Sequence, residues 1–135
     1  MSMGVVKKRL ENMESYMIVL GAGADIFEEL RAVFENSGWE EAFIVNAIGS
    51  GKKGVVRYPK TMDLPPEVAT KEYEGSFELV SMVGIVRKEK NGTNLHIHAS
   101  FVDEGDRFYG GALGKGSTVY KKLEIFLMVR PGDRK

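Results

Sequence analysis

The chain has 135 residues, which fits one domain that can bury a core without cross-links. Its 19 basic and 19 acidic residues give a formal charge of zero, whereas a dedicated nucleic-acid-binding protein usually carries a basic surplus. The absence of cysteine excludes disulfides and thiolate metal sites. There is no membrane-length apolar run and no signal-peptide pattern, so a cytoplasmic location is expected.

The residue pattern predicts three parts. Residues 1–12 are expected to form a flexible arm, residues 13–131 a single α+β domain, and residues 132–135 a polar tail. At the start of the domain, a β-branched apolar run at residues 15–20 predicts a strand.

Residues 25–37 form the clearest helical pattern. Apolar residues recur on one face of it, at Ile26, Leu30, Val33 and Phe34. Asp25 is suited to cap the first turn, with Glu28 completing a capping box, and Gly38 is suited to end the last turn. We therefore predict one main helix here, lying on a sheet.

From residue 42 onward the sequence is β-rich. The predicted strands cover residues 42–48, 54–58, 77–87, 93–102 and 117–130. A glycine turn is expected to separate the first two of these, and a loop is expected at residues 61–69. Residues 88–92 predict a hairpin turn, and residues 103–116 a Gly-rich crossover.

The longest strands are apolar on both faces. In the last strand one face carries Leu123, Ile125, Leu127 and Val129, and the other carries Phe126 and Met128. In residues 77–86, strict alternation places Phe77, Leu79, Val83 and Ile85 on one face and Val80, Met82 and Val86 on the other. One helix about 20 Å long cannot cover both faces of such a sheet. We expect the second face to meet another subunit.

The two histidines of the chain, His96 and His98, are the strongest candidate site. On a strand they point to the same side, about 7 Å apart at the backbone. Such a pair can hold two corners of a metal site. A third ligand would have to come from the carboxylates Asp103, Asp106 and Glu124 or from water. Hydrogen-bonded histidines lining a pocket or interface are the interpretation that we favour.

Other motifs in the sequence do not support a defined chemistry. The segment 110–116 has neither the spacing nor the helix of a phosphate-binding loop, so Gly110 and Gly111 are interpreted as a point where backbone approaches backbone or ligand closely. The basic cluster of Lys52, Lys53, Arg57 and Lys60 is interpreted as a solvated loop and strand face. No nucleophile motif occurs, which favours a binding protein over an enzyme.

Several segments together resemble the plants-and-prokaryotes-conserved (PPC) domain. They are residues 95–100, residues 107–111 with Leu113 and Gly116, and Glu124 in the last strand. Residues 42–50, residues 72–84 and the start of the helix are similar as well. The resemblance spans residues 15–130.

The resemblance implies a mostly antiparallel sheet packed with one main α-helix and shorter helical turns, and a homotrimer. Stand-alone prokaryotic members are often described as predicted DNA-binding proteins, whereas plant members bind DNA through added AT-hooks. This chain has no such hook. Many prokaryotic members also have a histidine directly after the Gly-Gly pair, where this chain has Ala112.

These observations give two functional hypotheses. The first is a homotrimeric binding or regulatory module without a cofactor. Its pocket would contain His96, His98, Arg107, Gly110, Gly111 and Glu124. DNA is a candidate partner that the charge balance does not support. The alternative is an enzyme acting on a small molecule with a divalent metal such as zinc, held by His96, His98 and either Asp103 or Glu124.

Overall fold

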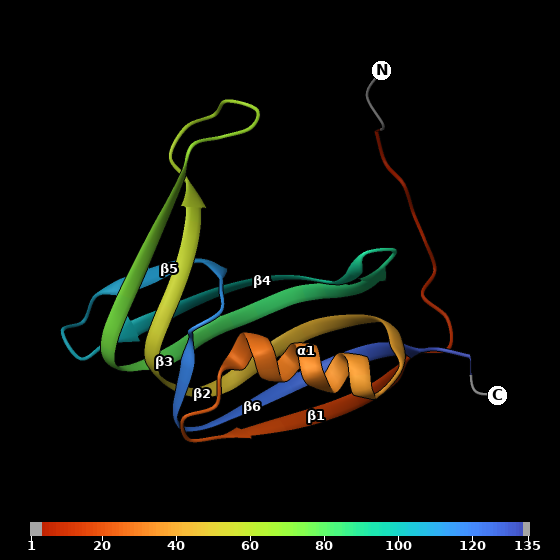
Figure 1. Cartoon of the computed structure of the whole chain (residues 1–135), viewed down its shortest axis with the longest axis horizontal. Coiled ribbons are helices and arrows are strands. Elements are labelled where there is room, and N and C mark those ends of the chain that lie inside the picture. Colours follow the sequence, from red (N-terminus) through yellow and green to blue (C-terminus); the bar gives the residue numbers. More distant parts are fainter. Residues whose placement is uncertain (1–3, 134–135) are drawn as a thin grey trace.

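A computed structural model describes residues 4–133, and the rest of the predicted arm and tail lies outside the described residues. Residues 4–133 form one antiparallel sheet in the order β1-β6-β2-β3-β4-β5, with a single helix against it (Figure 1). The elements are β1 (Glu14–Gly21), α1 (Ile26–Asn36), β2 (Trp39–Pro59), β3 (Val68–Glu89), β4 (Gly92–Asp103), β5 (Phe108–Leu113) and β6 (Thr118–Pro131). The expected sheet-rich α+β fold is thus confirmed in outline. Shorter helical turns are not found in residues 4–133, where turns, bends and irregular loops join the strands from β2 to β6.

The predicted helix forms where expected. The carboxylate of Asp25 accepts a hydrogen bond of 3.0 Å from the Glu28 backbone N–H and so caps the first turn. Gly38 follows the last turn with a φ of 68°, a conformation that glycine adopts without strain. The apolar face of α1 is buried against the sheet through Ile26, Leu30 and Phe34.

The prediction of a glycine turn between two strands is wrong, because β2 continues through these glycines as one strand of 21 residues. Register shifts between Gly49 and Lys53 bend β2 without reversing it. A Cβ on Gly49 would lie 2.2 Å from the Lys122 carbonyl oxygen, and one on Gly51 would lie 2.1 Å from the Phe77 ring. Glycine therefore lets β2 pass close to its neighbours at the bend.

The strand β3 also differs from the prediction. It begins at Val68 and pairs with the second half of β2, so these two segments form a long hairpin arm with residues 60–67 at its tip (Figure 1). Further along β3, a bulge between Leu79 and Ser81 shifts the alternation by one residue. Its core residues are consequently Phe77, Met82 and Val86, whereas the exposed Val80 and Val83 lie on the opposite face of the sheet.

The predicted crossover at residues 103–116 contains a further strand, β5. It pairs with β4 along one edge and with β2 along the other, through Val56 with Leu113 and Arg57 with Ala112. The segments β2 to β5 thus close on themselves at this end of the sheet. Aromatic rings fill the closed end. The Phe77 and Phe101 rings stack with their centroids 4.2 Å apart, and the ring centroids of Tyr73 and Tyr109 are 3.6 Å apart.

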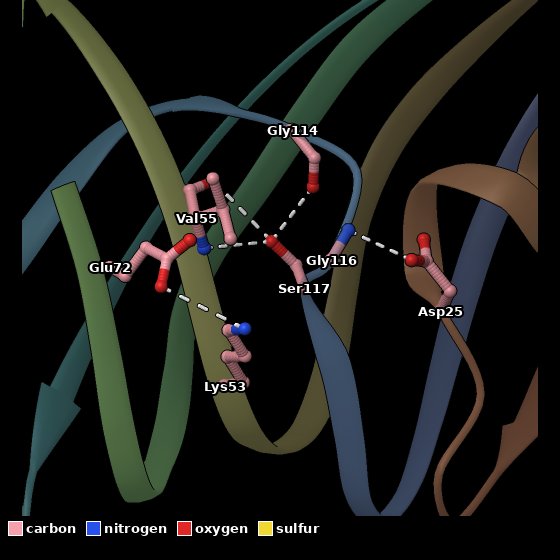
Figure 2. A network of polar contacts seen from close by, with 7 residues as sticks. All are labelled: Asp25, Lys53, Val55, Glu72, Gly114, Gly116 and Ser117. Carbon is pink, nitrogen blue, oxygen red and sulfur yellow. Dashed lines mark hydrogen bonds and ion pairs between the residues drawn. The ribbon is translucent and has the colours of Figure 1, made fainter. Parts of the chain in front are cut away.

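A buried serine ties the start of β6 to this closed end (Figure 2). The Ser117 hydroxyl donates to the Gly114 carbonyl at 2.9 Å and accepts from the Val55 backbone N–H at 3.0 Å. Beside it, the second carboxylate oxygen of Asp25 accepts from the Gly116 N–H at 2.8 Å. The network joins the cap of α1, the β5–β6 loop and the β2 strand of the hairpin arm.

The face of the sheet opposite α1 remains uncovered, and apolar side chains from four strands are exposed on it. They are Met17 and Val19 of β1, Val45 and Ile48 of β2, Val80 and Val83 of β3, and Phe126 and Met128 of β6. We call this the outer face. The prediction that β6 has one buried apolar face and a second face that also carries apolar side chains is confirmed. Across residues 4–133, no helix is long and apolar enough to cross a bilayer.

Replacing Ser117 with alanine is expected to destabilise the fold by about 1–3 kcal/mol, because the Val55 N–H would lose its partner inside the protein. The matched control is Ser76→Ala, since the exposed Ser76 hydroxyl makes one long contact of 3.5 Å with Glu104. That change should cost less than about 0.5 kcal/mol. Denaturant unfolding of both variants measures the difference, and equal free energies of unfolding would contradict the role given to Ser117.

Candidate functional site

The two histidines lie side by side on β4, as their spacing predicts. His96 and His98 are both exposed, and their Nε2 atoms are 3.0 Å apart. Because a neutral imidazole has one donor and one acceptor nitrogen, one ring donates to the other. The flanking residues Ile97 and Ala99 are buried in the core. The strand therefore presents both imidazoles on the outer side of the sheet.

The imidazoles line a groove of about 630 Å³ between the hairpin arm and the β4–β5 pair. One wall comes from the arm, with Arg57, Tyr58, Pro59, Pro66 and Val68, and the other residues that line it are His96, His98, Gly111 and Ala112. A second, shallower depression connects the histidines with the outer face through Phe43, Val83 and Ile85. The groove therefore adjoins the uncovered apolar surface.

Strand register aligns three of the groove residues. Arg57 on β2 pairs with Ala112 on β5, and Ala112 pairs in turn with His98 on β4. Side chains of directly paired residues lie on the same side of a sheet. Arg57, Ala112 and His98 thus form one row, which we call the groove row, with the smallest side chain in the middle.

The Gly-Gly pair is what allows β5 to lie between its two neighbours. A Cβ on Gly111 would stand 2.6 Å from the Arg57 carbonyl oxygen, and one on Gly110 would stand 3.0 Å from the Ala99 carbonyl oxygen. The interpretation of these glycines as a close backbone approach is confirmed. These two glycines therefore affect the shape of the groove.

Two of the predicted pocket residues lie away from the groove. Arg107 is in the β4–β5 turn, where its guanidinium makes an ion pair of 3.0 Å with Asp103. The backbone N–H of Arg107 donates to the same carboxylate, and this hydrogen bond is the main cause that lowers the pKa of Asp103. Glu124 lies on β6, which β2 and β3 separate from β4, and it pairs with Lys122 at 2.9 Å.

The fit of a metal ion to one chain is consequently incomplete. Within the described part of the chain, no three His, Asp or Glu side chains are grouped so that they could hold a metal ion. His96 and His98 supply two nitrogen ligands, while Asp103 and Glu124 are engaged elsewhere. Ala112 occupies the position beside His98 from which a third side chain could reach the pair.

Arg57 is a groove residue that the sequence analysis missed. It was grouped with nearby lysines as part of a solvated strand face, and it is indeed exposed. No local pattern marks its place next to Ala112, because the two residues are brought together by pairing of β2 with β5. The expected turn between residues 48 and 54 also hid the continuity of β2 that carries Arg57 there.

Truncating the histidines should leave the fold nearly intact. His98→Ala is expected to cost about 1 kcal/mol of unfolding free energy, because the side chain is exposed and makes one hydrogen bond within the chain. Ile97→Ala, the matched core variant, should cost about 2–5 kcal/mol, since Ile97 is 1% exposed. Thermal or denaturant unfolding at two protein concentrations checks this difference. Equal destabilisation would identify the histidines as structural groups.

Comparison with known proteins supports the family resemblance. The chain matches the model of the Plants and Prokaryotes Conserved (PCC) domain over residues 7–130. A search of curated protein sequences finds no match.

Three solved structures illustrate the similarity. A plant- and prokaryote-conserved protein from Pyrococcus horikoshii is 25% identical with a TM-score of 0.74, and the match covers 99% of this chain and 87% of that one. A metal-containing protein from Archaeoglobus fulgidus is 25% identical with a TM-score of 0.77, covering 97% and 88%. A candidate DNA-binding protein from Bacteroides thetaiotaomicron shares the fold at 18% identity and a TM-score of 0.75, covering 94% and 84%. With the family match over residues 7–130, the chain belongs to the Plants and Prokaryotes Conserved domain family.

Proposed function

We propose that the protein is a homotrimeric binding module, in which the outer face is buried between subunits and the groove beside His96 and His98 takes a ligand. The observation that carries this proposal is the uncovered apolar outer face. Three is the number of subunits that the family resemblance implies.

The composition of the outer face supports association. Its exposed residues are aliphatic side chains, two methionines and a phenylalanine, spread over β1, β6, β2 and β3. Burying such side chains contributes about 25 cal/mol for each Å² removed from water. Contiguous apolar surface that spans several strands is typical of a protein interface. A second and third copy of the chain would cover it without any further component.

The position of the groove supports ligand binding near that interface. His96 and His98 lie on the outer side of the sheet, and the depression at Phe43, Val83 and Ile85 runs from them toward the apolar residues. A subunit packed on the outer face would therefore deepen the groove. Binding of ligand and association of subunits would then favour one another.

The native chain of 15.0 kDa is expected to sediment as a particle of about three times that mass, 45 kDa, at micromolar concentration. Met128→Glu should shift it toward the monomer, because it places a charge in the middle of the outer face, where Met128 pairs with Phe43. Met62→Glu is the matched control, since Met62 is 99% exposed at the tip of the arm.

Sedimentation velocity measures these masses, and circular dichroism checks that each variant is folded. A monomer of the native chain at micromolar concentration would contradict the proposed assembly. A folded Met128→Glu variant that stays as associated as the native chain would show that another surface holds the subunits together.

A metal-assisted enzyme acting on a small molecule is the second candidate function. The exposed His96–His98 pair favours it, as does the similarity to a metal-containing protein from Archaeoglobus fulgidus. The incomplete ligand set of the single chain opposes it. Zinc is one of the ions that imidazole ligands suit in structural and catalytic sites.

Native protein purified without an affinity tag is expected to contain zinc, manganese, nickel and iron at well below one ion per chain. Ala112→His should raise zinc affinity by at least about tenfold, because the new imidazole would lie beside His98 in the groove row. Ser76→His, at an exposed position on β3, is the control. Elemental analysis and zinc titration check both statements. One tightly held ion per native chain would favour the enzyme instead.

Duplex DNA is a further candidate ligand for the assembly. The shared fold with the Bacteroides protein favours it, and the formal charge of zero opposes it. The basic residues available for phosphate contacts are Lys52, Lys53, Arg57 and Lys60 of the arm and its base. Of these, Lys53 forms an ion pair of 3.8 Å with Glu72.

A further inference from the structure

The groove contains a cation that has no partner. Among the described residues, the Arg57 guanidinium makes neither a hydrogen bond nor an ion pair, although most other arginines of the described chain are engaged by carboxylates or carbonyls. It lies on the wall of the groove at the start of the groove row. An arginine placed there is available to a molecule from solution.

The groove row leaves space beside this cation. Arg57 and His98 are two strand spacings apart, about 9.5 Å at the backbone, and only the methyl group of Ala112 lies between them. The two outer side chains can therefore both reach a group that sits above Ala112. Any larger residue at this position would fill the gap.

The charge and polarity of the lining restrict what fits there. Within the described part of the chain, the titratable groups that line the groove are Arg57, Tyr58, His96 and His98, and no Asp or Glu lines it. The remaining wall is apolar, with Pro59, Pro66 and Val68 on the arm. The groove thus combines one permanent positive charge with an apolar wall.

We propose that the groove binds a small organic carboxylate with an apolar body. The carboxylate lies above Ala112, accepts two parallel N–H bonds from the Arg57 guanidinium and sits beside the His98 imidazole, whose Nε2 atom is engaged with His96. The apolar body lies against the arm, next to Pro66 and Val68. One guanidinium matches the geometry and the single charge of a carboxylate, whereas a polyphosphate needs several cations.

This inference rests on the proposed function for the location of the ligand site, and it does not depend on the number of subunits. It also does not require a metal ion. It assigns to Arg57 the recognition of the ligand's charge and to Ala112 the space in which that charge is held.

The probe is phenylacetate, with the uncharged phenylacetamide as its closest neutral counterpart, titrated into EDTA-treated protein and followed by backbone amide NMR. Phenylacetate is expected to shift the resonances of Ala112 and Val68 and to reach saturation. Phenylacetamide should bind at least about tenfold more weakly, since one charge-assisted interaction of about 1.4 kcal/mol or more is lost. Arg57→Gln should weaken the binding of phenylacetate by the same factor. Arg107→Gln, which removes an arginine paired with Asp103, should not.

Equal binding of the acid and the amide would overturn the proposal, as would native-like binding by Arg57→Gln. Absence of any shift at Ala112 and Val68 up to tens of millimolar probe would overturn it as well. So would binding that appears only before EDTA treatment, because a bound metal ion would then be the anion receptor. Sedimentation of the same samples separates the two claims. A trimer without carboxylate preference overturns this inference alone, and a monomer that prefers the acid overturns only the assembly.

Discussion

The unbroken path of β2 is the constraint on which the other elements depend. Its first half pairs with β6 and β3, and its second half pairs with β3 and β5. The bend that allows this requires glycine at positions 49 and 51. At Gly49 the neighbouring backbone, and at Gly51 the Phe77 ring, lie too close to leave room for a Cβ atom. Had the chain turned back there, β2 would not reach β5, and the closed end of the sheet would not form.

The same bend produces two different environments in one sheet. Before the bend, the sheet is open, with α1 on one face and the apolar outer face exposed. After it, the strands close around stacked aromatic rings, and the hairpin arm projects beyond them (Figure 1). The histidines of β4 lie where these two regions meet, so the groove has the arm on one side and the outer face on the other.

The elements that the sequence predicted well are those fixed by local patterns. The helix follows from an apolar face with a cap at each end, and the second half of β6 follows from the strict alternation of its buried residues from Leu123 to Val129. The exposure of His96 and His98 on one side of β4 follows from a period of two. The family resemblance was also confirmed, because it rested on several separate segments over most of the chain.

The elements that were missed depend on tertiary pairing. The glycines at residues 49–51 have the composition of a turn, and only the neighbours that they approach distinguish a bend from a reversal. A single bulge in β3 moved Val83 and Ile85 to the face opposite the predicted one. Arg57 lacks a local signal of its place in the site, and Arg107 and Glu124 were included on the resemblance, although in one chain each pairs with a neighbouring charged residue away from the groove.

The central claim is that the outer face is where subunits meet, next to the groove. Cross-saturation between differently labelled subunits, observed at the methionine methyl groups, tests it most directly. In particles reassembled from two labelled samples, transfer should reach Met17 and Met128 on the outer face and should not reach the buried Met82 or the exposed Met62 at the tip of the arm. Transfer to Met62 without transfer to Met17 and Met128, or no transfer between subunits at all, would contradict the account.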